Sequence, residues 1–428
     1  MIEPILKKLH IFCLFLLVAS PPAIPAFSED LAMFSAPVAK DTAELYVAID
    51  RAVQTHPSIA AAKASASAAG ADVRATKWQR FPSFSLEGLF FNQSRNSLQA
   101  QAVVDQPLWT GGRISGVIER ARARQSAALA AYNEAVLAIA QSTAKSFYEV
   151  HLWRERRILL AISLEQHQRM VASMERRVAQ EVSPLSDLEL ARARALQINQ
   201  QIYQADAQER LALSRFHELI GDSLVTVGML PTSPASWPRL EDAKVTAEAL
   251  SFSPSLERLR SETRGAKAEA RIAGASILPQ LSGQYSYSEN FGHRVGVALK
   301  IQSDGGLSRF AAADAANQRV RASELQISAG ERQLRDELQA LLREYESETL
   351  RLDGSQSAAS AAQRVMDSYM RQFTSGRRTW LDVMNAVREA TSAEIDAVDA
   401  RISAQSSLVR ILLLSGRWTP ETVKSAQP

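Results

Sequence analysis

The hydrophobic and polar positions of this chain follow two different periods. Apolar and polar residues alternate over 81–108 and again over 279–303, whereas in the flanking segments apolar residues recur every three, four or seven positions. Alternation predicts strands with one apolar and one polar face, and the longer period predicts amphipathic helices. A polar stretch interrupts each alternating segment, at 93–96 and at 289–293, so each segment predicts a strand hairpin.

Two of the helical segments are unusually long. Residues 113–180 contain no proline and only Gly116 as a glycine, and a similar segment runs from Leu307 to Phe373. At 1.5 Å per residue, about 70 residues reach on the order of 100 Å. The spacing of their apolar residues is typical of a coiled-coil seam. We expect each long helix to turn back into a shorter one, so that two antiparallel hairpins result.

The breaks after these long helices carry helix-start signals. In the first, Ser183 is expected to cap the next helix with Pro184 in its first turn. In the second, Thr379 and Asp382 have the spacing of a capping box. An alanine-rich helix is expected from Thr42 to about 78, ahead of the first strand hairpin.

These elements occur twice, so the chain is expected to be a tandem duplication. Landmark residues recur at offsets of 194–197: Pro57 with Pro254, Pro82 with Pro279, Gly111 with Gly305, Asp187 with Asp382, and Gly221 with Gly416. The prediction is a first repeat over 27–221, a linker over 222–246, a second repeat over 247–416 and a tail over 417–428. Each repeat contains a helix, a strand hairpin (81–108 or 279–303), a long helix and a shorter helix.

The first 26 residues fit a secretory signal peptide. Lys7 and Lys8 precede the apolar run Ile11–Ala19, which is about half the length of a membrane-spanning helix, and Ser20–Ala26 lead to a small residue for cleavage. The single cysteine, Cys13, lies inside the apolar run, and the residues before it do not resemble a lipoprotein cleavage box. We therefore expect an exported protein without lipid anchor, disulfides or cysteine metal sites.

Charge and motifs indicate no enzyme. The net charge of +3 is too small to suggest a nucleic-acid partner. No two histidines of the mature chain have the i, i+4 spacing of a helical metal site, and the chain contains no H-E-x-x-H, no G-x-S-x-G and no glycine-rich phosphate loop. The sequence therefore predicts no catalytic residue, no cofactor and no metal.

Four strands per chain are too few to close a barrel. An open sheet edge in lipid leaves backbone groups unsatisfied, so strands of this kind in a membrane require an oligomer. Three chains would supply twelve strands, enough for a water-filled lumen, and the long helices would continue it as a tube. Taken alone, the strands also fit a half-buried soluble sheet.

Two motifs make the chain similar to the outer-membrane factor (TolC) family. They are Gln106–Gly112 (QPLWTGG), after the first strand hairpin, and Gly376–Asn385 (GRRTWLDVMN), at the second helix break. The resemblance implies an α+β membrane protein: a homotrimer with a twelve-stranded transmembrane β-barrel and a periplasmic α-helical barrel. It places the protein in the outer membrane of a Gram-negative cell, extending into the periplasm. The implied partners are outer-membrane lipid, a periplasmic adaptor and an inner-membrane transporter.

The same resemblance implies a gate at the periplasmic end. Arg378 falls on the gate arginine of the family, Asp187 on its carboxylate partner and Asp382 on the first aspartate of a constriction ring. Phe373 replaces the gate tyrosine and Asn385 replaces the second ring aspartate, so we expect a weaker latch and weaker cation binding. Locally, Asp382 also fits a simple helix cap, and Arg378 a solvated side chain.

The expected function is a passive export duct of a tripartite transporter. The absence of a lipid signal and the stretch 378–383 (RTWLDV) favour a role in type I protein secretion. A multidrug or small-molecule efflux channel is the alternative cargo class. A periplasmic coiled-coil adaptor or scaffold is the alternative of another class, but it would predict one helical hairpin between lipoyl-like and barrel domains instead of a duplicated unit containing strands.

Overall fold

The computed structural model describes residues 43–91, 97–223, 225–228, 230, 237–288, 292–301 and 306–419. The predicted signal peptide (1–26, with Cys13), most of the predicted tail, the 93–96 turn and residues 289–291 of the second turn lie outside the described residues, as does 231–236 of the linker.

Two similar sets of elements follow each other along the chain. The first set is α2 (Ala43–Thr55), α3 (Pro57–Lys77), η3 (Trp78–Arg80), β1 (Ser83–Phe91), β2 (Ser97–Trp109), α4 (Arg113–Ala179) and α5 (Leu185–Ile220). The second is α6 (Asp242–Phe252), α7 (Pro254–Ala275), β3 (Gln280–Ser288), β4 (Gly292–Lys300), α8 (Ser308–Thr374) and α9 (Trp380–Leu414). The predicted fold class, four strands combined with very long helices, is confirmed.

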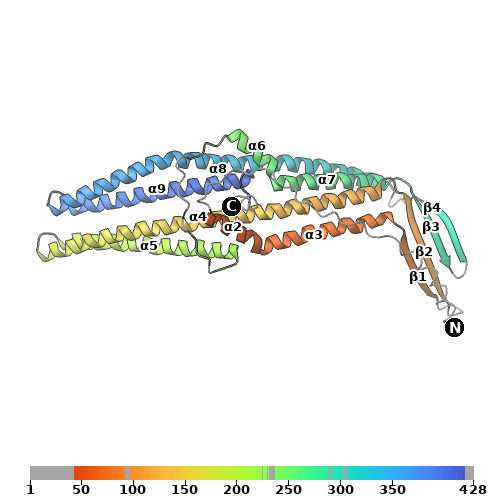
Figure 1. Cartoon of the computed structure of the whole chain (residues 1–428), viewed down its shortest axis with the longest axis horizontal. Helices are drawn as coiled ribbons and strands as arrows, with labels where there is room; N and C mark the ends of the chain where they lie inside the picture. The colour runs from red at the N-terminus through yellow and green to blue at the C-terminus, as the bar shows by residue number, and fades with distance from the viewer. Residues whose placement is uncertain are drawn as a thin grey trace. The chain divides into compact units, whose positions relative to one another are not determined.

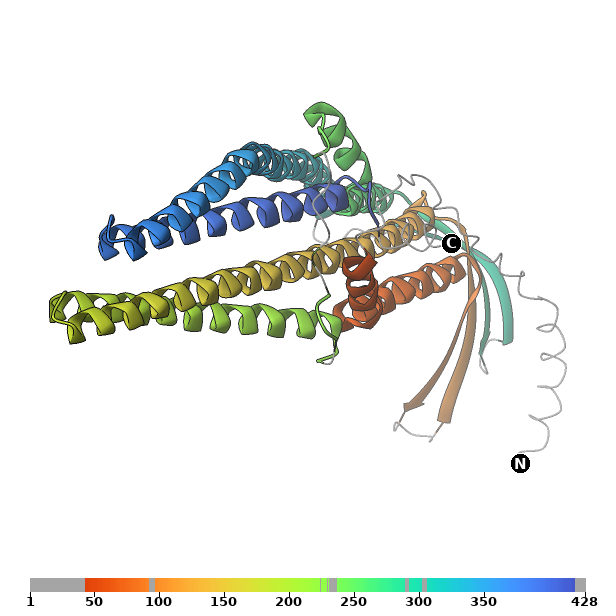
Figure 2. The ribbon, with the colours of Figure 1, turned by 60° about the vertical axis from the view of Figure 1, so that its left-hand side comes forward.

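The four strands form one antiparallel sheet in the order β1-β2-β3-β4. The two hairpins meet through β2 and β3, where Ala102 faces Tyr287 and Val104 faces Tyr285, so residues from different repeats become direct neighbours. The register shifts between Pro107 and Trp109, at the end of β2. Such a bulge bends a strand. Figures 1 and 2 show the sheet at one end of the long helices.

The long helices pair as two antiparallel hairpins, α4 with α5 and α8 with α9, which lie side by side in Figures 1 and 2. Both α4 and α8 have 67 residues. The predicted capping box of α9 is present, since Thr379 and Asp382 each bond the other's backbone N–H.

Three details of the helix ends differ from the prediction. The first helix is two helices, α2 and α3, because Pro57 disfavours a helical residue before it, and His56 instead caps α3 by accepting from Ser58 N at 3.3 Å. Pro184, and not Ser183, is the N-cap position of α5, and the Ser183 hydroxyl accepts from Arg177 Nε at 3.2 Å. Helix α6 begins at Asp242, inside the predicted linker.

Three groups of buried side chains stabilise the helices. The largest lies where α2, α4, α5 and α9 meet, and contains Leu45, Phe147, Phe216, Ile220 and Leu413. A second joins α6, α7, α8 and α9 around Leu338 and Leu342. The third, called the tip core below, joins the ends of α4, α5, α8 and α9 far from the strands; its buried members are Met170, Met174, Leu188, Ala191, Met366, Phe373, Val383, Met384, Ala386, Val387 and Ala390.

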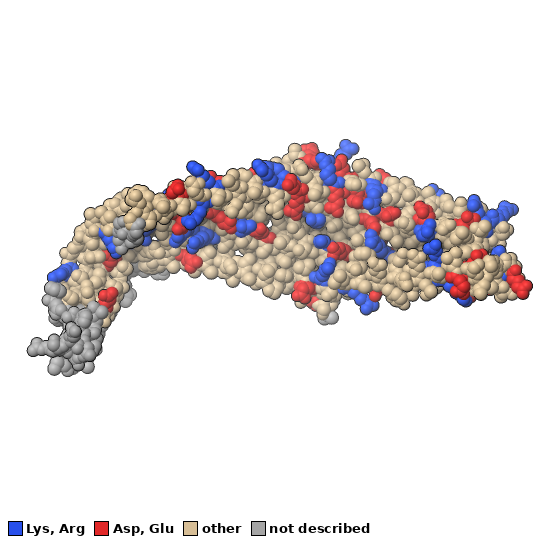
Figure 3. Space-filling view, turned by 180° about the vertical axis from the view of Figure 1, so that it is seen from behind, with Lys and Arg blue, Asp and Glu red and all other residues tan. Residues whose placement is uncertain are grey.

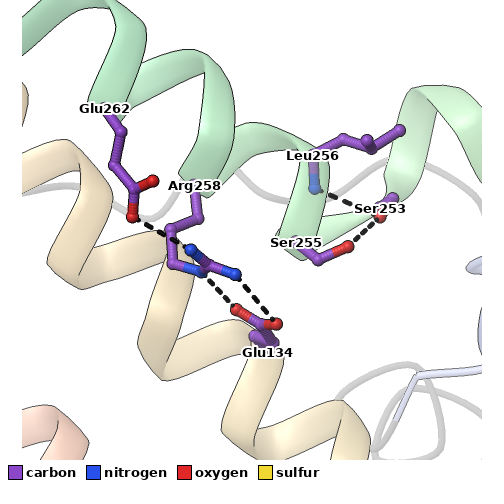
Figure 4. Close-up of polar contacts among 6 residues, drawn as sticks. All are labelled: Glu134, Ser253, Ser255, Leu256, Arg258 and Glu262. Atoms are coloured by element: carbon purple, nitrogen blue, oxygen red, sulfur yellow. Dashed lines mark hydrogen bonds and ion pairs between the residues drawn. The ribbon is translucent and has the colours of Figure 1, made fainter. Parts of the chain in front are cut away.

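Ion pairs also connect the two repeats. Figure 4 shows Arg258 of α7 donating to Glu134 of α4, with Nε 2.7 Å from Oε2, while its Nη1 lies 2.9 Å from Glu262 Oε1. In the same view Ser253 caps α7 by accepting from Leu256 N. On the face drawn in Figure 3, acidic and basic side chains are intermingled along the helices. The helices are therefore cross-linked by many small polar contacts around narrow apolar cores.

Candidate gate at the helix ends

The two helix turns of the predicted gate lie at the same end of the molecule. Glu181, between α4 and α5, and Gly376, between α8 and α9, both have left-handed backbone with φ of 57° and 72°. Beneath these turns the tip core holds the ends of all four long helices together. Any movement of one hairpin away from the other must therefore disturb this core.

Asp187 lies in the first turn of α5. Its Oδ2 accepts a hydrogen bond from the indole N–H of Trp380 at 3.0 Å, across 193 positions of sequence. Trp380 is the first residue of α9 and packs against the tip core. This bond joins the starts of the two shorter helices, one from each repeat.

Arg378 is held within its own helix turn. Its Nε donates to Gln372 Oε1 at 3.2 Å, and its Nη1 lies 3.9 Å from Asp382 Oδ2. Its guanidinium carbon is 4.2 Å from the centre of the Tyr369 ring, a cation–π contact. Within one described chain no ion pair joins Arg378 to Asp187, so a latch between them requires another arrangement or another protomer.

Asp382 completes the cap of α9. Its Oδ2 accepts from the Thr379 hydroxyl at 2.8 Å and from Thr379 N at 3.3 Å. Hydrogen bonds from Thr379 hold the pKa of Asp382 below its ordinary value, and the charge of Arg378 acts in the same direction. The structure thus gives this carboxylate the role of a helix cap, while leaving it partly exposed.

Phe373 and Asn385 occupy different surroundings. Phe373 is buried in the tip core, with the guanidinium of Arg177 5.5 Å from its ring centre. Asn385 is exposed and lines a groove of about 260 Å³ between α5 and α9, with α4 beneath it. The sequence analysis placed all five gate residues near the two turns but did not include Trp380 among them. The feature that could have indicated Trp380 is its position, a large aromatic residue at the first position after a helix break.

A second polar cluster lies farther along the helices. Glu209 of α5 accepts from Arg154 at 3.0 Å and from Arg157 at 2.7 Å, both on α4, and is only 9% exposed. Burial alone would raise the pKa of Glu209, but the hydrogen bonds and charges of Arg157 and Arg154 outweigh burial and lower it. The cluster therefore holds an ionised carboxylate between α4 and α5.

The same region connects α4 to α9 with two reciprocal ion pairs. Arg156 of α4 forms a two-point contact with Asp399 of α9, with Nε 2.8 Å from Oδ1. Arg401 of α9 donates to Glu155 of α4 at 2.9 Å. Because positive and negative charges alternate across this contact, the two hairpins are fixed in register as well as held together.

His151 lies beside this cluster and is 4% exposed. Its ring is 4.7 Å from that of Phe147, and its Nε2 is buried without a hydrogen-bond partner in the described structure. Burial, together with the charges of Arg154 and Arg401, lowers the pKa of His151 to about 4, although Glu209 opposes the shift. The imidazole is therefore neutral at neutral pH.

No helix in the described part of the chain combines the length and apolar character needed to cross a membrane. Among the same residues, no three histidine, cysteine or acidic side chains gather as metal ligands would.

Residues 48–222 match the model of a protein family described as outer membrane efflux protein. No curated protein matches the chain. The matched residues include the whole first strand hairpin and both α4 and α5. The family match therefore covers the helix break that carries Asp187.

The fold is similar to that of several solved outer-membrane proteins. CusC has 16% identity and a TM-score of 0.77, with 93% of this chain and 98% of that chain covered. VceC of Vibrio cholerae has 17% identity and a TM-score of 0.75, covering 87% and 96%. CmeC of Campylobacter jejuni, an outer membrane channel, has 13% identity and a TM-score of 0.76, covering 96% and 97%. These likenesses extend across both repeats.

The family match and the fold agree with the resemblance that the sequence motifs indicated: residues 48–222 match the outer membrane efflux protein family, and both repeats share the fold of solved outer-membrane proteins.

Proposed function

We propose that three copies of this chain form a passive export duct that carries substrate from an inner-membrane transporter and its adaptor across the periplasm and outer membrane. The observation that carries this proposal is the sheet. β1 and β4 are its outer strands, each paired on one side only in the described chain. Pairing β4 of one copy with β1 of the next would satisfy both edges, and three copies would close twelve strands.

The side chains of the sheet fit a lipid-facing wall. Val295, Val297, Leu299 and Ile301 alternate along and just beyond β4 and are 85%, 68%, 64% and 69% exposed. On β1, Phe84 and Leu86 are 66% and 70% exposed. An apolar stripe of this extent in water favours association, whereas in lipid it matches the alternating pattern of transmembrane barrels.

The helices supply the length of a periplasmic tube. With 67 residues each, α4 and α8 reach about 100 Å at 1.5 Å per residue. Channels of this family are trimers that work with a periplasmic adaptor and an inner-membrane transporter, which supports the same assembly here.

For the cargo we propose protein substrates of type I secretion. The stretch 378–383 (RTWLDV) favours this class, and the description of the matched family, efflux protein, favours small molecules as the second candidate. A strain that lacks this chain separates the two: loss of secreted protein at unchanged drug sensitivity supports secretion, and the reverse result supports efflux.

The gate that we propose lies at the tip. Arg378 and Asp187 do not touch within one chain, but both lie at the tip and Arg378 is partly exposed. Pairing Arg378 with Asp187 of a neighbouring copy would provide a charge-assisted latch worth about 1–3 kcal/mol.

Conductance in a planar bilayer tests both the duct and the latch. Small, stable steps that increase in Arg378→Ala would support a gated duct, and a protein extracted without detergent that conducts in neither form would contradict it.

A further inference from the structure

We infer that Trp380 is a positioning residue of the gate. By donating its indole N–H to Asp187, Trp380 holds the two helical hairpins of one chain together and so keeps the channel closed. This inference rests on the proposed duct function and adds a link inside each protomer to the proposed latch between protomers. Three features support this inference: the geometry of the hydrogen bond from Trp380 to Asp187, the restricted freedom of both residues, and the position of the bond between the two repeats.

The bond has the geometry and chemistry of a strong link. Trp380 Nε1 lies 3.0 Å from Asp187 Oδ2, in partly buried surroundings. An indole N–H can only donate, and a buried tryptophan normally finds an acceptor. The acceptor is an aspartate carboxylate, so the bond is charge-assisted.

Both residues are placed with little freedom. Trp380 follows Thr379 directly, and the capping box between Thr379 and Asp382 fixes the backbone at the start of α9. Asp187 is fixed in the first turn of α5, where its N–H donates to Pro184 O at 3.1 Å. The Trp380 ring also packs against the tip core. If α5 and α9 moved apart, neither side chain could keep the hydrogen bond without losing the contacts that fix it in its own helix.

The bond lies between the two helix starts that must separate when the channel opens. It joins the first turn of α5, in the first repeat, to the first residue of α9, in the second. Moving the α8–α9 hairpin outward separates these turns and exposes the indole. The bond also uses Oδ2 of Asp187 and leaves Oδ1 for another donor, so Trp380 would orient the carboxylate for Arg378 of a neighbouring copy.

The sequence adds a reason for this chain to rely on Trp380. Phe373 has no hydroxyl and is buried in the tip core, so it cannot provide a polar link there. Within one described chain, Arg378 is engaged with Gln372, Tyr369 and Asp382. Trp380 is thus the residue that bonds Asp187 across the two hairpins.

The decisive variant is Trp380→Phe, which removes the donor and keeps an aromatic ring. Loss of one charge-assisted bond of about 1.4 kcal/mol shifts a two-state equilibrium about tenfold. We therefore expect the open fraction in planar bilayers to rise about tenfold. Trp237→Phe is the control, since Trp237 packs on Tyr345 away from the tip and its replacement leaves the open fraction unchanged.

A double-variant cycle distinguishes the bond from general loosening. If Trp380 acts through Asp187, then Asp187→Ala raises the open fraction, and Trp380→Phe adds little in the Asp187→Ala background. Additive effects of the two variants would overturn the inference. Wild-type protein that forms no pore would instead contradict the duct itself, so the two failures are distinguishable.

A covalent cross-link between positions 187 and 380 tests the same inference by strengthening the connection instead of removing it. Cys13, in the predicted signal peptide, is the only cysteine of the chain, so Asp187→Cys combined with Trp380→Cys would create a unique pair. We expect a short reducible thiol linker to lower the open fraction below that of the wild type, and reduction to reverse the effect. A cross-linked channel that still opens normally would overturn the inference.

Discussion

Gly416 lies so close to Phe252 that a Cβ atom at position 416 would overlap the phenylalanine ring. Its φ of 72° is also in the left-handed region, which glycine adopts without strain. This contact joins the end of α9 to the end of α6. Position 416, at the end of the predicted second repeat, therefore requires glycine for two reasons: its backbone conformation and its contact with Phe252.

We predict that Gly416→Ala lowers the free energy of unfolding by more than about 2 kcal/mol, because the methyl group meets both a strained φ and the Phe252 ring. Thermal unfolding followed by circular dichroism measures the effect. The control is Gly354→Ala in the middle of α8, where an added Cβ meets nothing within 4 Å. That substitution should raise stability by up to about 1 kcal/mol through helix propensity. Equal losses in both variants would contradict the packing argument.

Glu209→Gln should loosen the contact between α4 and α5. The neutral amide leaves Arg154 and Arg157 facing each other without the charge between them. We expect a loss of about 1.5–3 kcal/mol, as for a hydrogen bond to a charged group. Arg210→Gln is the comparison, since Arg210 bridges Asp206 on an exposed face and its loss should cost less than about 1 kcal/mol. Similar losses would contradict a special role for Glu209.

Acid should destabilise the wild type through the same carboxylate. The folded pKa of Glu209 is below its ordinary value, so its contribution is present above the unfolded pKa, near 4.3, and is lost as the pH falls through the folded pKa. The difference in melting temperature between wild type and Glu209→Gln should therefore shrink below about pH 4. A difference that is independent of pH would contradict this assignment.

His151 should make stability depend on pH in a higher window. Its folded pKa is lowered to about 4, whereas the unfolded value is near 6.5. Between these values the unfolded chain binds more protons, so stability falls as the pH is lowered from about 6.5 to 4. The slope is at most about 1.4 kcal/mol per pH unit. The melting temperature of His151→Leu should fall less over this window than that of the wild type, and parallel curves would contradict the prediction.

The apolar face of the sheet should not tolerate charge. Val297→Arg places a guanidinium on that face, where an arginine near the middle of a bilayer costs about 2–4 kcal/mol. We expect fewer heat-modifiable trimers in the outer-membrane fraction. Ser282→Arg, on the polar face of the neighbouring strand β3, is the matched control and should assemble normally. Loss of trimers in the control alone would reverse the assignment of the two faces.

The sequence by itself determined most of the elements, because their signals are local. Alternation defined both strand hairpins, the scarcity of glycine and proline defined α4, and the spacing of Thr379 and Asp382 defined the cap of α9. The break at His56 was missed although Pro57 signals it, since an alanine-rich segment on both sides outweighed a single proline. Local signals give the type of an element more reliably than its ends.

The tertiary structure alone decided which residues meet. The pairing of β2 with β3, the position of Glu209 between two arginines and the bond from Trp380 to Asp187 each join residues that are 52 to 193 positions apart or lie in different repeats. A duplicated sequence shows that Asp187 and Asp382 occupy equivalent positions, but not that one accepts from an indole while the other caps its own helix. Those partners follow from how the two hairpins pack, and packing depends on distant side chains that no local pattern records.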